Sequence, residues 1–342
     1  MKNPLNKVLI IAPAWVGDMV MAQTLFKLLK QRIPDLIIDV LASNVTRPIL
    51  LRMPEVHQTL SLPFGHGELK FFQRWKMGRD LQVKGYDQAI ILPNSFKSAV
   101  LPYAAKIPVR TGWQRELRGW LLNDGRKLNK NKLPLMIQRF IALGLPKGME
   151  VPTSPLWPEL RIDADNTIKV LRKLELNAKD KPMMAICPGA EYGPAKRWLP
   201  QYYAEVAMAK IKEGWQVWIF GGPKDQQVAS EIQNNANHSC IDLTGKTSLL
   251  DAIDLMALSR VVVTNDSGLM HIAAAVNRPL VVIYGSSSPQ FTPPLANRVK
   301  ILSLNLECSP CFKRICPLGH FRCMRDLKAA KVLQALNEVE NK

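Results

Sequence analysis

The chain has 342 residues, of which 47% are hydrophobic and 22% charged, values typical of a soluble globular protein with two domains. It carries a formal net charge of +18, unevenly spread. Residues 1–155 contain 23 Lys and Arg against 10 Asp and Glu, a net +13, whereas residues 156–342 contain 23 against 18, a net +5. A basic N-terminal half favours an anionic partner. The sequence has no zinc-finger spacing, basic zipper or aromatic RNA-binding consensus, so that partner is not expected to be nucleic acid.

The N-terminal segment MKNPLNKVLIIAP is where a targeting signal would lie. Its apolar stretch spans only about seven residues, is rich in β-branched side chains and ends at Pro13 without a small-residue cleavage site. These features predict a buried first strand rather than a secretory signal. No apolar run approaches the ~20 residues that a membrane helix needs. We therefore expect a cytoplasmic protein.

Short runs rich in Val and Ile alternate along the chain with longer amphipathic segments. The predicted strands are Val8–Ala12, Ile37–Leu41, Gln88–Leu92, Met183–Cys187, Val217–Phe220, Val261–Thr264 and Leu280–Ile283. The predicted helices are Val20–Lys30, Tyr202–Glu213, Gln226–Asn235, Leu249–Leu258, Leu269–Val276 and Asp326–Glu340. Strands that are apolar on both faces and alternate with helices form parallel sheets covered on both sides. The predicted fold class is therefore α/β.

The segment LPKGMEVPTSPLWPEL, residues 145–160, contains four prolines and so cannot sustain a helix or a central strand. It predicts an N-terminal Rossmann-like domain over 1–150, a linker over 151–160 and a second Rossmann-like domain over 161–325. The remaining segment, 326–342, is expected to form a helix that can pack back on the N-terminal domain. In doubly wound sheets, ligands bind beyond the carboxyl ends of the strands. Two such sheets facing each other would form a cleft with two sub-sites.

The first candidate loop, Ala14–Asp18, follows the first predicted strand. Gly17 permits a tight turn or a close approach of the backbone to a ligand. Asp18 either stabilises the start of the next helix or presents a carboxylate that accepts a proton from a sugar hydroxyl. The loop lacks G-x-G-x-x-G, so an ordinary dinucleotide site is not expected.

The second candidate loop, Cys187–Trp198, follows the first predicted strand of the second domain. It combines two glycines and two prolines with the adjacent pair Lys196 and Arg197. Such a loop suits a diphosphate, because Lys acts as a point charge and Arg as a two-pronged donor. Gly189 and the basic pair are candidate contacts, as is Gly221 in the loop after the strand VWIF. The alternative is a solvated surface pair.

The third candidate loop follows the predicted strand Val261–Thr264. Ser267 and Gly268 open a helix whose free amides can hold a phosphate. Asp266 either accepts hydrogen bonds from sugar or ribose hydroxyls or caps the helix. His271 lies about one turn into this helix, where a lone His is more often structural than functional.

Four of the six cysteines crowd into the stretch CSPCFKRICPLGHFRC, at Cys308, Cys311, Cys316 and Cys323. In a cytoplasmic chain they are expected to be reduced thiols or metal ligands, not disulfides. Structural zinc usually takes two ligand pairs separated by a longer loop. The compact spacing therefore favours reduced, partly buried thiols over zinc, even with His320 nearby.

Four segments in this order resemble the inverting glycosyltransferases of family nine, the heptosyltransferases, which have the GT-B fold. They are PAWVGDMVMAQTLF, LPNSFKSAVLPYAAKIPVRTGW, CPGAEYGPAKRW and TNDSGLMHIAAAVNRPLVVIYGSSSPQFTPP. The resemblance covers nearly the whole chain and implies two Rossmann-like domains facing across a cleft. It implies ADP-L-glycero-D-manno-heptose as donor and heptosyl-Kdo2-lipid A, part of the lipopolysaccharide inner core, as acceptor. It also implies inversion at the anomeric carbon without a cofactor or an essential metal.

The resemblance further implies roles for individual residues. Asp18 matches the family's proposed general base, and Lys196 matches the lysine proposed to stabilise the leaving diphosphate. The D-[ST]-G-x-x-H donor motif is matched by Asp266, Ser267, Gly268 and His271. Glu191 and Tyr192 depart from the hydroxyl residues that a related enzyme places near the phosphates, so those contacts are not carried over.

Acceptor recognition is expected in the basic first domain, through the first loop and the stretch Asn94–Arg118. The candidate residues are Trp15, Gly17, Asn94, Ser95, Lys97, Arg110, Arg115 and Arg118, which are expected near the carboxyl ends of first-domain strands, beside Asp18. Cations there would meet the carboxylates and phosphates of the acceptor, and the same domain would contact the anionic inner leaflet peripherally. The alternative is that these arginines only aid solubility.

Three other functions fit the same sequence features. Another heptosyltransferase of the family, adding the first or a later heptose, would share the fold and the donor motif. A sugar-nucleotide or nucleic-acid binding module without catalysis would not need Asp18. An epimerase with the same two-domain fold would release a free sugar in the absence of any acceptor.

Overall fold

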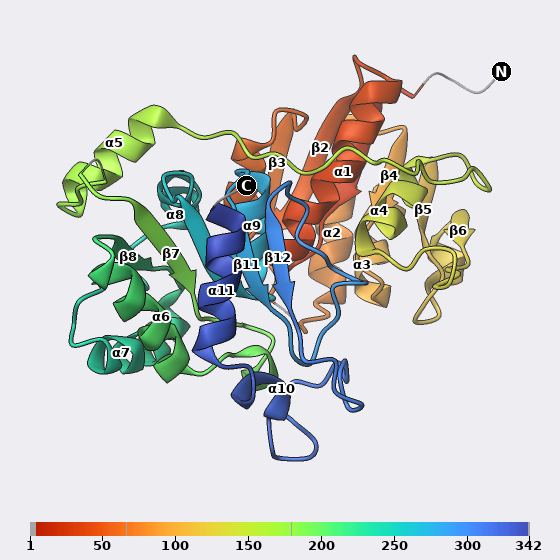
Figure 1. Ribbon diagram of the computed structural model, residues 1–342. Coiled ribbons are helices and arrows are strands. Elements are labelled where there is room, and N and C mark those ends of the chain that lie inside the picture. The colour runs from red at the N-terminus through yellow and green to blue at the C-terminus, as the bar shows by residue number, and fades with distance from the viewer. Residues whose placement is uncertain (1–4, 66, 179, 341–342) are drawn as a thin grey trace. The chain divides into compact units, whose positions relative to one another are not determined.

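The computed structural model describes residues 5–65, 67–178 and 180–340. The chain divides into two compact units, the first ending at Pro158 and the second beginning at Glu159 (Figure 1). This boundary falls within the proline-rich segment 151–160, which contains neither helix nor strand. Across the described ranges, no helix has the length and apolar character to cross a membrane.

The first unit contains a six-stranded parallel sheet with the order β3-β2-β1-β4-β5-β6. Its strands are β1 (Lys7–Ile11), β2 (Ile37–Ser43), β3 (Gln58–Leu62), β4 (Gln88–Ile91), β5 (Val109–Trp113) and β6 (Asp124–Arg126). Its helices are α1 (Val16–Arg32), α2 (Phe71–Leu81), α3 (Phe96–Ala104) and α4 (Met136–Gly144), with 3-10 turns η1 (Arg47–Arg52), η2 (Gln82–Lys84) and η3 (Arg118–Leu121). The central strands β1 and β4 are apolar and almost wholly buried, as strands covered by helices on both faces must be.

The second unit contains a second six-stranded parallel sheet, with the order β12-β11-β10-β7-β8-β9. Its strands are β7 (Met183–Cys187), β8 (Gln216–Ile219), β9 (Ile241–Asp242), β10 (Val261–Asn265), β11 (Leu280–Ile283) and β12 (Val299–Leu302). Its helices are α5 (Ala164–Lys173), α6 (Pro200–Lys212), α7 (Gln226–Asn235), α8 (Leu249–Met256), α9 (Gly268–Ala275), α10 (Arg322–Arg325) and α11 (Ala329–Glu340), with 3-10 turns η4 (Pro194–Lys196) and η5 (Pro223–Asp225).

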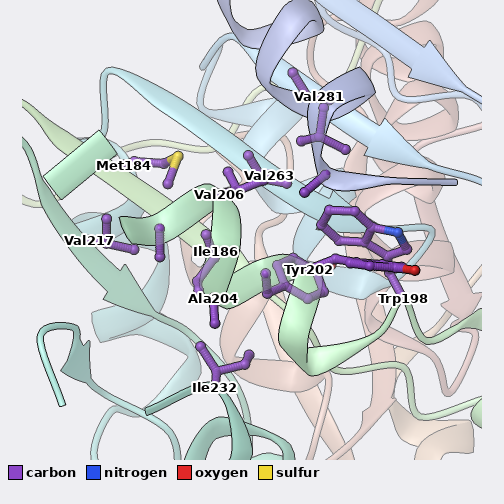
Figure 2. Packing of buried hydrophobic residues seen from close by; sticks show 14 of the residues in the cluster. Met184, Ile186, Trp198, Tyr202, Ala204, Val206, Val217, Ile232, Val263 and Val281 are labelled. Carbon is purple, nitrogen blue, oxygen red and sulfur yellow. The ribbon is translucent and has the colours of Figure 1, made fainter. Parts of the chain in front are cut away.

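Aromatic side chains of the second core, among them Trp198 and Tyr202, lie where the loop after β7 leads into α6 (Figure 2). Trp198 and Tyr203 are fully buried and pack edge to face, with 4.9 Å between their ring centroids. The Trp198 indole donates to the Leu327 carbonyl at 2.8 Å. Truncation of a buried aromatic side chain of this size to Ala typically lowers the free energy of unfolding by about 3–5 kcal/mol. The loop between β7 and α6 is therefore anchored firmly to the core and to the C-terminal segment.

The α/β class is confirmed, and the seven predicted strands correspond to β1, β2, β4, β7, β8, β10 and β11. The strands β3, β5, β6, β9 and β12 lie outside the predicted set. Each of them is short, polar in part or only half-buried, so it lacks the continuous apolar run that marks a central parallel strand.

The C-terminal segment forms the helix expected for it. The segment 326–342 is expected to form a helix that can pack back on the N-terminal domain, and α11 packs against α6, β11 and β12 of its own unit. Val332, Leu336 and Val339 recur at helical spacing and belong to the second core. The apolar stripe of this helix is thus covered locally; residues 341 and 342 lie outside the described ranges.

Candidate active site

Each sheet has one switch point, where the order of successive strands reverses direction. In the first sheet it lies between β1 and β4, and in the second between β7 and β10. Ligands of open α/β sheets bind where loops leave the carboxyl ends of such strand pairs. Most of the predicted residues follow these strands: 14–18 and 94–97 follow β1 and β4, and 188–198 and 266–271 follow β7 and β10. The exceptions are Gly221, which follows β8, and the predicted arginines of the first unit, which lie in or after β5. Within each unit, the topology brings together loops that the sequence analysis found separately.

The two switch-point loops of the second unit are fastened by Asn265, a fully buried residue at the end of β10. Its side-chain nitrogen donates to the Pro188 carbonyl at 2.6 Å. Its side-chain oxygen accepts hydrogen bonds from the Trp198 amide at 3.1 Å and the Tyr203 hydroxyl at 3.0 Å. Asn265 therefore fixes both ends of the loop that carries Lys196. Sequence reasoning missed this role, although a polar residue ending an apolar strand was the available signal.

An ion pair between Lys196 and Asp266 lies at the centre of this site. Lys196 Nζ is 2.6 Å from Asp266 Oδ2, and the two side chains are 18% and 5% exposed. The ammonium also lies 5.2 Å from the centre of the Tyr192 ring. Since an ammonium has three donor hydrogens, the pair orients Lys196 and leaves it able to bind phosphate oxygens. The structure thus brings together two residues that are 70 positions apart in sequence.

Three serine hydroxyls at this edge of the sheet are buried without a hydrogen-bond partner in the described chain. They belong to Ser267, Ser286 and Ser287. Ser267 is the N-cap residue of α9, yet its side chain caps no amide. The other two follow β11, the neighbour of β10. Buried hydroxyls are seldom left unbonded, and a helix N-terminus favours anions, so this edge is suited to a polar, negatively charged ligand. The GSSS sequence after an apolar strand was the signal for the two additional serines.

His271 lies on α9 and is 5% exposed. Burial lowers its pKa to about 4, although Asp266 acts in the opposite direction; Lys196 lowers it further. The imidazole is therefore neutral near pH 7 and can donate or accept a hydrogen bond without adding charge to the site.

Gly189 and Gly221 both leave space for the side chain of Asp225, and their contacts with the donor stay a prediction. A Cβ atom at Gly189 would lie 2.5 Å from the Asp225 carboxyl, and one at Gly221 would lie 2.8 Å from the Asp225 Cβ. Burial raises the pKa of Asp225, which accepts a hydrogen bond from the Gly222 amide at 3.0 Å. Arg197, whose Nε is buried without a partner in the described chain, lies close enough to oppose that rise. Asp225 had no role in the sequence prediction.

Asp18 occupies the corresponding edge of the first unit, in the first turn of α1. The N-cap residue of this helix is Trp15, which makes no side-chain capping bond and is 38% exposed. Asp18 is the third helical residue and is half-buried. The negative charge of Asp18 near the N-terminus of α1 stabilises the helix, but Asp18 does not occupy the capping position. The carboxylate is thus placed at the switch point of the first sheet, after Gly17.

The loop after β4 supplies Asn94, Ser95 and Lys97, of which Asn94 is exposed and the others half-buried. Burial, and after it the charge of Arg74, lowers the pKa of Lys97. The Phe96 amide donates to Glu116 Oε2 at 2.8 Å, which ties this loop to the segment after β5.

Two arginines of the predicted acceptor set require correction. Arg118 is fully buried, and burial lowers its pKa to about 10. Its guanidinium donates to the carbonyls of Trp113, Pro93 and Ser95 and to the Ser98 hydroxyl. Arg110 lies at the amino end of β5 and donates to the carbonyls of Leu121 and Ile107. A count of charges in the sequence cannot separate such buried, structural arginines from exposed ones. Arg115, in contrast, is exposed and follows β5.

The four clustered cysteines line one small cavity together with His320. Burial, and then the neighbouring cysteines, raises the pKa of the Cys323 thiol, whereas backbone amides lower that of Cys316. Over the described residues, no group of three or more His, Cys, Asp or Glu side chains is arranged to hold a metal ion. The segment also supports the loop of Lys196, because the Ala195 amide donates to the Arg314 carbonyl at 3.0 Å.

We expect protein purified without chelator to contain well under one zinc ion per chain, because the thiols do not form a closed ligand set. Metal analysis by mass spectrometry checks this expectation. Stoichiometric zinc, together with unfolding on chelation, would contradict it.

Comparison with known proteins identifies the family to which the chain belongs. Residues 74–322 match the model of glycosyltransferase family 9 (heptosyltransferase). The chain is 45% identical to lipopolysaccharide heptosyltransferase 2 of Escherichia coli K12 over 97% of both chains. It is 43% identical to lipooligosaccharide heptosyltransferase 2 of Haemophilus influenzae, over 97% of this chain and 99% of that one.

A solved structure of E. coli ADP-heptose LPS heptosyltransferase II is similar over 98% of both chains, with a TM-score of 0.87 and 43% identity. A family 9 glycosyltransferase from Veillonella parvula has a TM-score of 0.88 at 20% identity, over 100% of this chain and 99% of that one, and so shares the fold. The family match, the full-length similarity and the shared fold lead to one assignment: this chain belongs to glycosyltransferase family 9, the heptosyltransferases.

Proposed function

We propose that this protein is an inverting glycosyltransferase that moves L-glycero-D-manno-heptose from ADP-heptose to the first heptose of heptosyl-Kdo2-lipid A. The relatives named heptosyltransferase 2 support this choice of acceptor. The observation that carries the proposal is the Lys196–Asp266 pair at the switch point of the second sheet, which holds a cation oriented before a ligand arrives. A preorganised charge of this kind stabilises a leaving group better than one that must reorient.

The donor diphosphate would lie against Lys196, Ser267 and the N-terminus of α9. As the bond between the anomeric carbon and the diphosphate oxygen breaks, negative charge grows on that oxygen. Lys196 and the helix dipole oppose this charge. Because ADP is a good leaving group, the reaction needs no general acid.

The acceptor hydroxyl would transfer its proton to Asp18 as its oxygen attacks the anomeric carbon from the face opposite ADP. One carbon–oxygen bond forms, the bond to ADP breaks with its electron pair on the diphosphate, and the configuration inverts. The acceptor is a lipid, so we place the reaction at the cytoplasmic face of the inner membrane, with the protein bound peripherally.

The test is mass spectrometry of heptosyl-Kdo2-lipid A incubated with ADP-heptose and purified protein. A mass increase of one heptose supports the proposal. Transfer only to an acceptor that lacks the first heptose, or only to a longer core, would assign the chain to another step. Free heptose without acceptor would indicate an epimerase, and binding without either product would indicate a non-catalytic module.

Acceptor binding should depend on salt more strongly than donor binding, because exposed charges are screened over ~8 Å at physiological ionic strength. We expect the acceptor KM to rise with salt, and Arg115→Ala to raise it at low salt and flatten the dependence. Arg172→Ala, an exposed arginine on α5, serves as the control. An acceptor KM that is flat with salt, or unchanged in Arg115→Ala, would remove Arg115 from the acceptor site.

Arg118→Ala should instead lower the melting temperature of the protein, since the guanidinium of Arg118 donates to buried carbonyls.

A further inference from the structure

Six aromatic side chains of the first unit form a continuous row across α2, α3 and η3, which we call the aromatic strip. Its members are Phe71, Phe72, Trp75, Tyr103, Trp120 and Phe96. Successive ring centroids lie 5.7–6.1 Å apart, within the range of direct aromatic contact. The strip joins residues up to 49 positions apart, so it is a product of the fold and not of one segment.

The outer members of the strip face solvent. Phe72 is 85% exposed, Trp120 63% and Trp75 37%, and Leu117 next to η3 is 92% exposed. The inner members Phe71, Phe96 and Tyr103 rest on the core of the first unit. Single exposed apolar residues are ordinary, but a contiguous apolar patch on a soluble protein marks an interaction surface.

The elements that carry the strip are held rigidly. A Cβ atom at Gly78 of α2 would lie 2.5 Å from the Leu101 carbonyl oxygen of α3, so the two helices pack backbone to backbone there. Buried Arg74 ties the start of α2 to the carbonyls of Leu69 and Glu68. Buried Arg118 does the same for η3 and the loop after β4. The exposed rings therefore stand on a preformed platform.

The surroundings of the strip are basic. Residues 67–120 contain ten Lys and Arg against four Asp and Glu, and without the buried Arg74 and Arg118 the net charge is still +4. The Arg110 guanidinium lies 5.3 Å from the centre of the Tyr103 ring, and Lys76 and Arg79 are exposed on α2. Aromatic rings combined with cations are typical of protein surfaces that rest in the headgroup layer of an anionic bilayer. The shared positive charge disfavours a second copy of this chain as the occupant.

We propose that the aromatic strip is the surface through which this protein rests on an anionic lipid bilayer, with Phe72 and Trp120 entering the headgroup layer. The inference rests on the proposed function in one respect, since a bilayer-embedded acceptor gives the surface its purpose. It adds the surface, the residues and the lipid charge that the proposed function leaves unspecified.

Vesicle sedimentation tests the strip without any transfer reaction. Wild-type protein should bind phosphatidylglycerol vesicles more tightly than phosphatidylcholine vesicles, and more weakly as salt rises. The double variant Phe72→Ser/Trp120→Ser should bind the anionic vesicles about tenfold more weakly. Ile168→Ser, an apolar residue that is 49% exposed on α5, is the matched control and should bind like wild type. Equal binding of wild type and the double variant, or no preference for anionic vesicles, would overturn the proposal.

A second measurement separates lipid contact from sugar contact. With a water-soluble acceptor that lacks acyl chains, the double variant should transfer heptose at the wild-type rate; with the acceptor in phosphatidylglycerol vesicles, it should be about tenfold slower. Equal losses on both acceptors would assign the strip to acceptor sugars and overturn the proposal. The single variant Phe72→Ser guards against misfolding of the double variant, because this side chain projects into solvent. Failure of wild type to transfer would contradict the proposed function while leaving the vesicle result standing.

Discussion

Replacing Asp18 by Asn should reduce the turnover of heptose transfer by about 10²–10⁴, the usual contribution of a general base. The substitution keeps the size of the side chain and removes its charge and basicity. Asp18 lies in the first turn of α1 at the switch point of the first sheet, and the capping position belongs to Trp15. Binding of ADP should change less than about twofold, because the diphosphate contacts that we propose belong to the second unit.

The control for this prediction is Asp35→Asn, an exposed carboxylate after α1 that takes no part in the site. Circular dichroism and the melting temperature should be similar in both variants, since a first-turn charge contributes only about 0.3–1 kcal/mol. If Asp18→Asn keeps more than a tenth of wild-type turnover and folds normally, Asp18 only stabilises the start of α1.

The sequence predicted the central strands of both sheets well, because burial on both faces leaves an unbroken apolar run. The run MMAIC became β7 without any change of bounds. The strand β5, VRTGW, carries an arginine whose guanidinium is satisfied by nearby carbonyls, so it lacks the unbroken apolar run of the predicted strands. Edge and partly polar strands depend on tertiary partners that a local pattern does not contain.

The candidate site was predicted loop by loop, but the contacts that assemble it are long-range. Lys196 and Asp266 were each picked out by local chemistry, whereas their 2.6 Å pairing follows from the strand order. Asn265 looked like the end of a strand, and its role appeared only with the loop it fastens. The prediction of Arg118 as a surface contact was wrong, because the sequence shows its charge but not the buried carbonyls to which it donates.

Replacing Lys196 by Ala should lower turnover more than it weakens donor binding. Charge on the leaving diphosphate grows toward the transition state, so a cation that meets it stabilises that state more than the bound donor. Loss of one preorganised donor of this kind typically costs about 10²–10³ in turnover. We expect the dissociation constant for ADP to rise less than about tenfold, measured by calorimetry beside single-turnover rates.

Lys196→Ala also leaves the Asp266 carboxylate, which is 5% exposed, without its cation. The unpaired negative charge would repel the diphosphate and so weaken donor binding separately from the loss of the lysine. The double variant Lys196→Ala/Asp266→Asn removes that charge and should recover ADP binding but not turnover. Lys224→Ala is the matched control, because Lys224 pairs with Glu191 at 2.6 Å and is 77% exposed. Its turnover should stay near wild type. The contrary result would be an equal loss of turnover and of ADP affinity in Lys196→Ala, with both restored in the double variant. Lys196 would then stabilise the bound donor and the transition state equally, and it would have no special part in the departure of ADP.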